Sequence, residues 1–285
     1  MSYTIAVVDR LPPMLTACSL AVACAALSVF VISRRWALIG EGISHSGFGG
    51  AGTVWLLMLA FPSIEHSPSA AYYGVVIFSL ATGLAIGYFT RSGKLNSDAI
   101  IGIFMVASLA WGILAQEIFS HVRQYEPSGW DTFLFGRMDV SLPFSLVATA
   151  ICAAVVAIVV VLGKEIVAYC FDPVMAEASG VRVGFIHYLL ILLVTLTIVI
   201  GVRIAGAVLV TALLVLPGAT ALLLSKKLKN SVIVSLIVGL LGALGGVTVY
   251  FRKEFIFPGP AIVLLLFVEF VVAYGLSKLK GASAG

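Results

Sequence analysis

Residues 185–224 read FIHYLLILLVTLTIVIGVRIAGAVLVTALLVLPGATALLL, and this stretch decides the fold class. Arg203 is its only residue with a fixed charge. A continuous helix of this length would be about 60 Å long, roughly twice the thickness of the hydrocarbon core of a bilayer. The chain must therefore turn, and the segment GVRIAG at 201–206 offers two glycines and the charge. The stretch predicts two membrane spans joined at that segment.

The rest of the chain has the same apolar character. Of 285 residues, 61% are hydrophobic and 11% are charged, and the mean hydropathy is +1.14. Soluble domains carry about 25% charged residues, so the composition excludes a soluble protein. Apolar runs near or above about 18 residues indicate helical spans and not barrel strands, which alternate over about ten residues. We expect an all-α polytopic membrane protein, a single domain over residues 1–285. About nine spans can be drawn, at 14–33, 37–61, 72–90, 98–116, 140–163, 185–201, 204–224, 232–250 and 257–276.

The distribution of lysine and arginine predicts the orientation, because cytoplasmic loops carry an excess of both. With the N-terminus outside and nine spans, the inner side holds eleven of the 17 basic residues, and the C-terminus is cytoplasmic. The first residues, MSYTIAVVDRLPPM, lack the basic start and cleavage site of a signal peptide, so we expect the first span to be retained. The four cysteines show no CxxC spacing and are interpreted as small apolar residues, not as a disulfide framework or metal cluster.

The segment GEGISHSGFGG at 40–50 carries the chemistry of the second predicted span. On a helix, Glu41 and His45 lie one turn apart on the same face, and the surrounding glycines leave room beside them. Imidazole and carboxylate are ligands for divalent first-row metals, and the oxygen ligand keeps the affinity moderate. Alternatively, Glu41 extends to the water interface and His45 bonds to a neighbouring helix. The residues alone leave both interpretations open.

Two other features lie within predicted spans. Glu269, in LLLFVEFVVAYG, is expected to face the interior of the bundle, because ionisable side chains are costly in lipid. Pro217 and Gly218 are expected to kink or interrupt the seventh span, and the backbone carbonyls that this frees can line a translocation path.

The inner segment KEIVAYCFDPVMAEASGVRVG, at 164–184, predicts a short helix across the cytoplasmic face. Asp172 is an N-cap acceptor and Pro173 suits the first helical position. Gly180 is placed to end the helix after Ser179. The segment is either an ordinary amphipathic connector or a docking element for a soluble partner.

The outer segment 117–139, EIFSHVRQYEPSGWDTFLFGRMD, is rich in acidic residues. Glu117 and His121 are spaced i, i+4, and Glu126, Asp131 and Asp139 follow. A solvated loop explains this composition, and so does a vestibule that attracts cations or the docking face for an external binding protein.

Known catalytic signatures are missing from the sequence. It contains no GxxxxGK[ST] nucleotide-binding loop, no HExxH and no GxSxG. Catalysis by this chain is therefore not expected, and ATP hydrolysis that drives any transport must come from a separate subunit.

Several stretches, in the same order, resemble one family, the permease subunits of zinc, manganese and iron ABC transporters. ALIGEGISHSGFGG (37–50) resembles the start of the family's second span, which is usually written with aspartate where this chain has Glu41. FDPVMAEASGV (171–181) resembles its cytoplasmic coupling segment, and GAVLVTALLVLPGATALLL (206–224) resembles a late span. WDTFLFGRMDVS (130–141) is a weaker match.

The resemblance implies an inner-membrane permease that forms the path for a divalent metal, with no tightly bound cofactor. Glu41 and His45 match the family's metal-path carboxylate and histidine. The implied partners are two cytoplasmic ATP-binding subunits, a metal-carrying solute-binding protein outside, and a second permease subunit, identical or closely related. The implied coupling segment is 164–184, and its matched residues are Asp172, Pro173, Met175, Ala176, Glu177 and Gly180.

Three alternatives to a divalent-metal permease are considered. A permease for metal chelates would not need an ExxxH pair. An ATP-independent secondary cation transporter predicts carboxylates on several spans and an inverted repeat, whereas only Glu269 lies clearly mid-span. A non-transporting scaffold would leave Glu41 and His45 unexplained. Zinc, manganese and iron all suit a site of mixed nitrogen and oxygen ligands.

Overall fold

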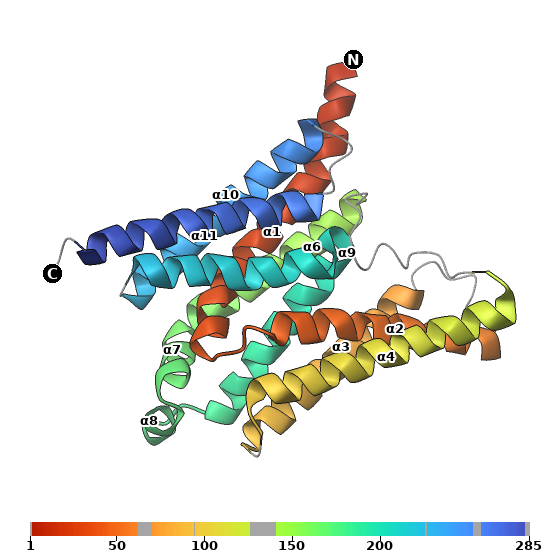
Figure 1. Cartoon of the computed structure of the whole chain (residues 1–285), viewed down its shortest axis with the longest axis horizontal. Helices are drawn as coiled ribbons and strands as arrows, with labels where there is room; N and C mark the ends of the chain where they lie inside the picture. Colours follow the sequence, from red (N-terminus) through yellow and green to blue (C-terminus); the bar gives the residue numbers. More distant parts are fainter. Residues whose placement is uncertain are drawn as a thin grey trace.

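The computed structural model describes residues 2–61, 70–93, 95–125, 141–225, 227–252 and 258–282, and every regular element within these ranges is a helix. Figure 1 shows their arrangement. The helices are α1 (Ser2–Ser33), α2 (Ile39–Ala60), α3 (Ala70–Arg91), α4 (Ser97–Arg123), α6 (Leu142–Val161), α7 (Gly163–Phe171), α8 (Pro173–Ala178), α9 (Val183–Leu224), α10 (Leu228–Arg252) and α11 (Pro258–Ala282). This confirms the prediction of an all-α polytopic chain.

The long apolar stretch breaks inside the predicted window. Gly206 has φ 76° and ψ 169°, a backbone conformation that interrupts α9 and that glycine adopts at little cost. The helical part before the break, Val183–Ile204, is long enough to cross a membrane, and the part after it, Leu209–Leu224, is shorter. α9 continues through Pro217 to Leu224, so the proline itself does not interrupt the helix.

The expected number of about nine spans is not confirmed. Within the described ranges, seven helical segments are long and apolar enough to cross a membrane. Two of the predicted spans differ from the rest. The helix Leu209–Leu224 has 16 residues, which reach about 24 Å at 1.5 Å per residue. The other is α2, in which glycines and serines dilute the apolar side chains.

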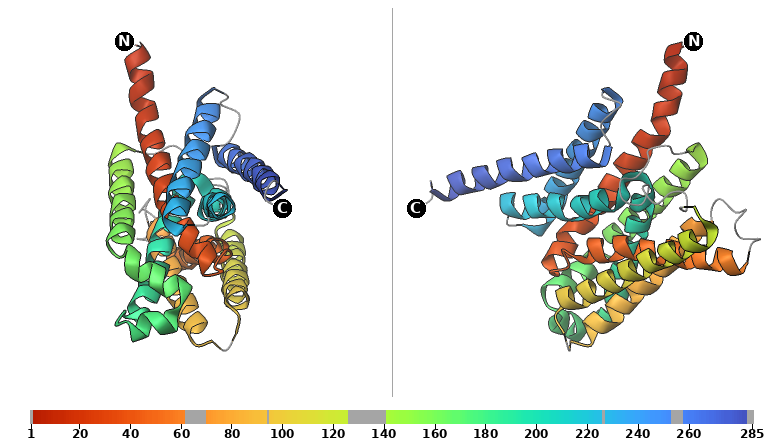
Figure 2. Two further views of the ribbon diagram at one scale, coloured as in Figure 1. Left: turned by 90° about the vertical axis from the view of Figure 1, so that its left-hand side faces the viewer. Right: turned by 45° about the vertical axis from the view of Figure 1, so that its right-hand side comes forward.

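α1 and α9 form the centre of the bundle. They pack against each other, with α10 and α6 also on α1 and α11 also on α9. On the other side, α2, α3 and α4 pack together, and α2 and α3 also contact α9. The right-hand view of Figure 2 shows α10 and α11 on one side of α1, and α2, α3 and α4 on the other. The large buried side chains of α1 and of the first part of α9 belong to one continuous apolar cluster.

The glycines of α2 bring three helices into backbone contact. A Cβ atom at Gly50 would lie 2.5 Å from the carbonyl oxygen of Gly74, and one at Gly52 would lie 3.0 Å from Cα of Gly112. The spacing of Gly242 and Gly246, four residues apart, likewise admits Leu266 and Ile262 of α11. The glycines around Glu41 and His45 therefore do not leave open space, because neighbouring helices fill it.

Replacing Gly50 with alanine is expected to destabilise the permease by about 1–3 kcal/mol, because α2 and α3 must separate to admit the methyl group. Gly102 is the matched control: a Cβ there meets no described atom within 4 Å. The thermal midpoint of the purified protein should fall for Gly50→Ala and stay unchanged for Gly102→Ala. Equal midpoints for the two variants would show that the close approach of α2 to α3 does not hold the fold together.

α8 forms as the inner segment predicts. The Asp172 carboxylate accepts hydrogen bonds from the backbone amides of Val174 at 2.9 Å and Met175 at 3.1 Å, and Pro173 occupies the first helical position. The helix ends at Ala178, one residue earlier than expected, and Gly180 follows with φ 87°. The cap and the helix-ending glycine are confirmed.

Candidate metal-binding site

Glu41 and His45 lie near the N-terminus of α2, as their spacing predicts. His45 Nε2 is 3.4 Å from Glu41 Oε1, so the two side chains can reach one ligand together. The His45 ring stacks on Phe48, with ring centroids 5.8 Å apart and planes at 22°. Phe48 is buried and fixes the plane of the imidazole.

The side chains of Glu41 and His45 lie at a surface that the rest of this polypeptide covers only in part. The side chain of Glu41 is 39% exposed and that of His45 is 19% exposed. Nδ1 of His45 is buried and has no hydrogen-bond partner among the described residues. The pair therefore lies at a partly covered face of the bundle.

Thr211 adds a third polar group beside the carboxylate. Its hydroxyl hydrogen-bonds to the Glu41 side chain. Gly40 allows this approach, because a Cβ there would lie 3.4 Å from Cα of Thr211. Thr211 belongs to the part of α9 after the break at Gly206. Its role was not predicted, since 170 positions separate it from Glu41 and no local pattern marks it.

Two protein ligands do not complete a metal site. Within the ranges that the structure describes, no three histidine, cysteine or carboxylate side chains gather closely enough to hold an ion. First-row divalent metals take four or more ligands. The four cysteines are free, and three of them are buried. The remaining ligands of a bound ion must come from water, from small molecules that accompany the ion, or from another subunit.

Pro217 and Gly218 lie against α1. The Gly218 amide donates to the Ser28 hydroxyl at 2.8 Å, and this hydroxyl donates to the carbonyl of Val215 at 3.4 Å. A Cβ at Gly218 would lie 2.7 Å from the carbonyl carbon of Ser28. Ser28 thus satisfies backbone groups at the proline and holds α9 to α1. That these residues line a path stays a prediction.

The remaining ionisable candidates lie apart from the pair. Glu269, on α11, is half-buried, and its Oε2 atom has no hydrogen-bond partner among the described residues. Glu117 and His121 are exposed on the last turns of α4. Glu126, Asp131 and Asp139 lie outside the described residues.

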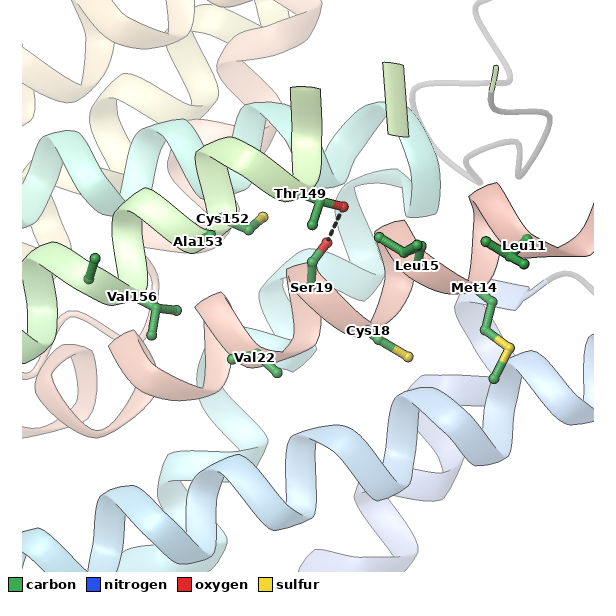
Figure 3. Close-up of a pocket in the computed structure, with 11 residues that line it drawn as sticks. Leu11, Met14, Leu15, Cys18, Ser19, Val22, Thr149, Cys152, Ala153 and Val156 are labelled. Carbon is green, nitrogen blue, oxygen red and sulfur yellow. Dashed lines mark hydrogen bonds between the residues drawn. The ribbon is translucent and has the colours of Figure 1, made fainter. Parts of the chain in front are cut away.

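A groove between two other helices lacks metal ligands. It has a volume of about 770 Å³ and lies between α1 and α6 (Figure 3). Its lining is apolar apart from Ser19 and Thr149, whose hydroxyls are 3.3 Å apart, and the thiols of Cys18 and Cys152. No histidine or carboxylate is among the lining residues. This groove is therefore not a candidate metal site, despite its volume.

Comparison with known proteins places these features in a family. A profile of the ABC 3 transport family matches residues 11–277. The manganese transport system membrane protein MntC of Halalkalibacterium halodurans is 32% identical over 259 residues, which cover 90% of this chain and 84% of that protein. A probable iron transport system membrane protein of Haemophilus influenzae is 28% identical, covering 94% of this chain and 93% of that protein.

A solved structure shows the same fold. PsaBC from Streptococcus pneumoniae, in complex with a Fab, superposes with a TM-score of 0.75 at 26% sequence identity. The match covers 95% of this chain and 94% of that chain. The architecture described above is thus that of an ABC transporter permease, and the resemblance drawn from the sequence is confirmed.

Proposed function

This chain belongs to the ABC 3 transport family, and we propose that it is the permease subunit of an ATP-driven importer of a divalent transition-metal ion. The relatives named above transport manganese or iron. The observation that carries the proposal is the Glu41–His45 pair, with 3.4 Å between Oε1 and Nε2, on a partly open face of α2.

The open face supports a path between two permease subunits. A charged side chain at membrane depth faces a water-filled cavity or another protein surface, because lipid contact is costly. A second copy across the open face would bring a second Glu41 and a second His45, and two such pairs supply four ligands. Four mixed nitrogen and oxygen ligands suit manganese, iron or zinc and hold the ion loosely enough to release it.

The basic segments support an orientation with the N-terminus outside. In Figure 1 the ends of α1, α3 and α9 lie toward the lower and left sides, together with α7 and α8, and the N-terminus lies at the top. Arg34 and Arg35 follow α1, Arg91 ends α3, Lys164 lies on α7, and Arg182 stands between α8 and α9. The excess of positive charge assigns this side to the cytoplasm. With that orientation, α2 and Leu209–Leu224 would complete nine crossings.

α8 presents an apolar surface toward the cytoplasm, which suits a docking partner. The side chains of Val174 and Met175 are 76% and 63% exposed, and Phe171, just before the cap, is 72% exposed. Exposed apolar side chains grouped on a short, capped helix are typical of a protein interface. We assign this surface to the ATP-binding subunit, two copies of which would serve two permeases.

Transport then proceeds in three steps. A solute-binding protein releases the metal at the outer face, and Glu41 and His45 coordinate it transiently. ATP binding and hydrolysis in the cytoplasmic subunit displace α8, and the bundle opens inward. Both ligands must be unprotonated to bind the ion, so transport through the pair weakens as the pH falls.

The test is ATP-dependent uptake of manganese, iron and zinc into proteoliposomes that contain the permease, its ATPase and its binding protein. Glu41→Gln removes the ligand charge and is expected to lower uptake about tenfold or more. Asp98→Asn, which removes an exposed carboxylate from the first turn of α4, is the matched control and should transport normally. Uptake by Glu41→Gln equal to that of wild type would remove the pair from the path, and uptake of chelates alone would favour a chelate permease.

A further inference from the structure

A chain of buried hydrogen bonds joins three helices on the proposed cytoplasmic side. The Tyr169 hydroxyl is 2.6 Å from His187 Nδ1, and His187 Nε2 is 2.9 Å from the carbonyl oxygen of Gly87. A carbonyl only accepts, so Nε2 carries the proton, Nδ1 of the neutral ring accepts, and the Tyr169 hydroxyl donates. The direction of both hydrogen bonds is therefore fixed.

The side chains of Tyr169 and His187, which form these hydrogen bonds, are shielded from solvent. Tyr169 is 2% exposed and His187 is 5% exposed. Burial raises the pKa of Tyr169 to about 12, although the positive charge of Arg34 acts in the opposite direction. The hydroxyl therefore keeps its proton at physiological pH and remains a donor. Removing either partner would leave a buried polar group without its bond, which is costly.

These two hydrogen bonds connect the helix α7 to the rest of the bundle. Tyr169 lies on α7, His187 on the first turns of α9, and Gly87 near the end of α3. α8 is attached mainly to α7 and only slightly to α9. A displacement of α8 can therefore enter the bundle through α7, where Ile166, Tyr169 and Cys170 are the buried residues.

The same histidine also touches the segment that leads into α2. The Trp36 ring packs edge-on against the His187 ring, with centroids 5.4 Å apart. Arg34 lies 4.3 Å from the centroid of the Tyr169 ring and donates to the Tyr169 carbonyl at 3.5 Å. Trp36 is buried and stands only five residues before Glu41. His187 thus contacts α7, α3 and the entry to the metal-binding helix at once.

We infer that Tyr169 and His187 are positioning residues, whose hydrogen bond carries a displacement of α7 and α8 to α3 and to the start of α2. This rests on the proposed function, since it assigns the route by which the ATPase controls the Glu41–His45 pair. Neither residue touches the metal. A hydrogen bond is directional, so a short, buried one holds its two helices in a defined register.

The test is the coupling ratio of the reconstituted transporter, in metal ions taken up per ATP hydrolysed. Tyr169→Phe removes the hydroxyl and keeps the ring. We expect its ATPase rate to stay near that of wild type and its coupling ratio to fall about fivefold, the factor expected for one lost buried hydrogen bond. Tyr188→Phe, on the residue after His187, is the matched control, because it deletes a hydroxyl outside this chain of bonds.

A second variant separates the role of the bond from that of packing. His187→Leu keeps an apolar side chain at the site and removes the acceptor that faces Tyr169 together with the donor to the Gly87 carbonyl, so it should lower the coupling ratio at least as much. The double variant should be no worse than His187→Leu alone, since both substitutions remove the same Tyr169–His187 contact. A normal coupling ratio in Tyr169→Phe would overturn the inference, and so would failure of that variant to assemble, which would assign the contact to folding alone. If the wild type transports no metal in this assay, the proposed function fails instead.

Discussion

Replacing His45 with alanine is expected to lower ATP-dependent metal uptake at least tenfold while the complex still assembles. The expected loss is large because His45 supplies the nitrogen ligand of the pair, and even outer-shell changes at metal sites cost about 10–100-fold. Assembly should persist, because the His45 side chain is partly exposed and its ring stacks on Phe48 of the same helix. The measurement is the initial rate of uptake in proteoliposomes, together with the subunit ratio of the purified complex.

His121→Ala is the matched control for this variant. It removes an imidazole from the exposed end of α4 and leaves α2 unchanged. Uptake by this control should stay within about twofold of wild type, the range that a surface change outside the site produces. If both histidine variants lost uptake equally, the effect would not be specific to the Glu41–His45 pair. If neither lost it, His45 would be a packing residue.

Replacing Met175 with arginine is expected to abolish the functional attachment of the ATPase. Met175 is 63% exposed on α8, so the change should leave the permease itself folded. A charge buried at the centre of an interface costs about 2 kcal/mol or more, which lowers affinity roughly 30-fold. Co-purification of the tagged permease with its ATP-binding subunit should therefore be lost, and ATP-dependent uptake with it.

The matched control for Met175→Arg introduces an arginine elsewhere on the proposed cytoplasmic side, to test whether loss of the ATP-binding subunit is specific to α8. Ser92→Arg places the same side chain at an exposed position just after α3, on a different element from α8. This variant should retain the ATP-binding subunit. Retention of the subunit by Met175→Arg would show that α8 is an ordinary connector and that docking occurs elsewhere.

Local signals in the sequence predicted local structure well. Asp172 followed by Pro173 marks a helix start, since a carboxylate cap and a fixed φ act within three residues, and the cap is present. The ExxxH spacing also acts locally: residues four apart share one face of a helix, and His45 Nε2 lies 3.4 Å from Glu41 Oε1. The break in the long apolar stretch fell at Gly206, inside the predicted segment, because glycine tolerates the positive φ there.

Features that depend on tertiary contact could not be predicted. The approach of Gly50 to Gly74 depends on which helices become neighbours, and a glycine-rich sequence does not specify that. Tyr169 and His187 are separated by 18 residues and a helix end, so no periodicity links them. The extent of α1, from Ser2 through Pro12 and Pro13, also exceeds the apolar run that marks its span.

The span count shows how packing and hydropathy can conflict. The glycines that bring α2 against α3 and α4 contribute little apolar surface, so α2 does not qualify as a span by composition. Its N-terminal half carries Glu41, His45, Ser44 and Ser46, and the Ser46 hydroxyl donates a hydrogen bond to Ser79 of α3. A helix that lines a polar path is expected to look less apolar than one that faces lipid.

The central claim is that this permease conducts a divalent metal past the Glu41–His45 pair. The most direct test is element-resolved metal accumulation in cells that express the whole system, comparing wild type with the Glu41→Gln/His45→Ala double variant across manganese, iron, zinc and cobalt. The account predicts that wild-type cells accumulate at least one of these metals and that the double variant, assembled to the same level, does not. Equal accumulation of that metal in both strains would contradict it.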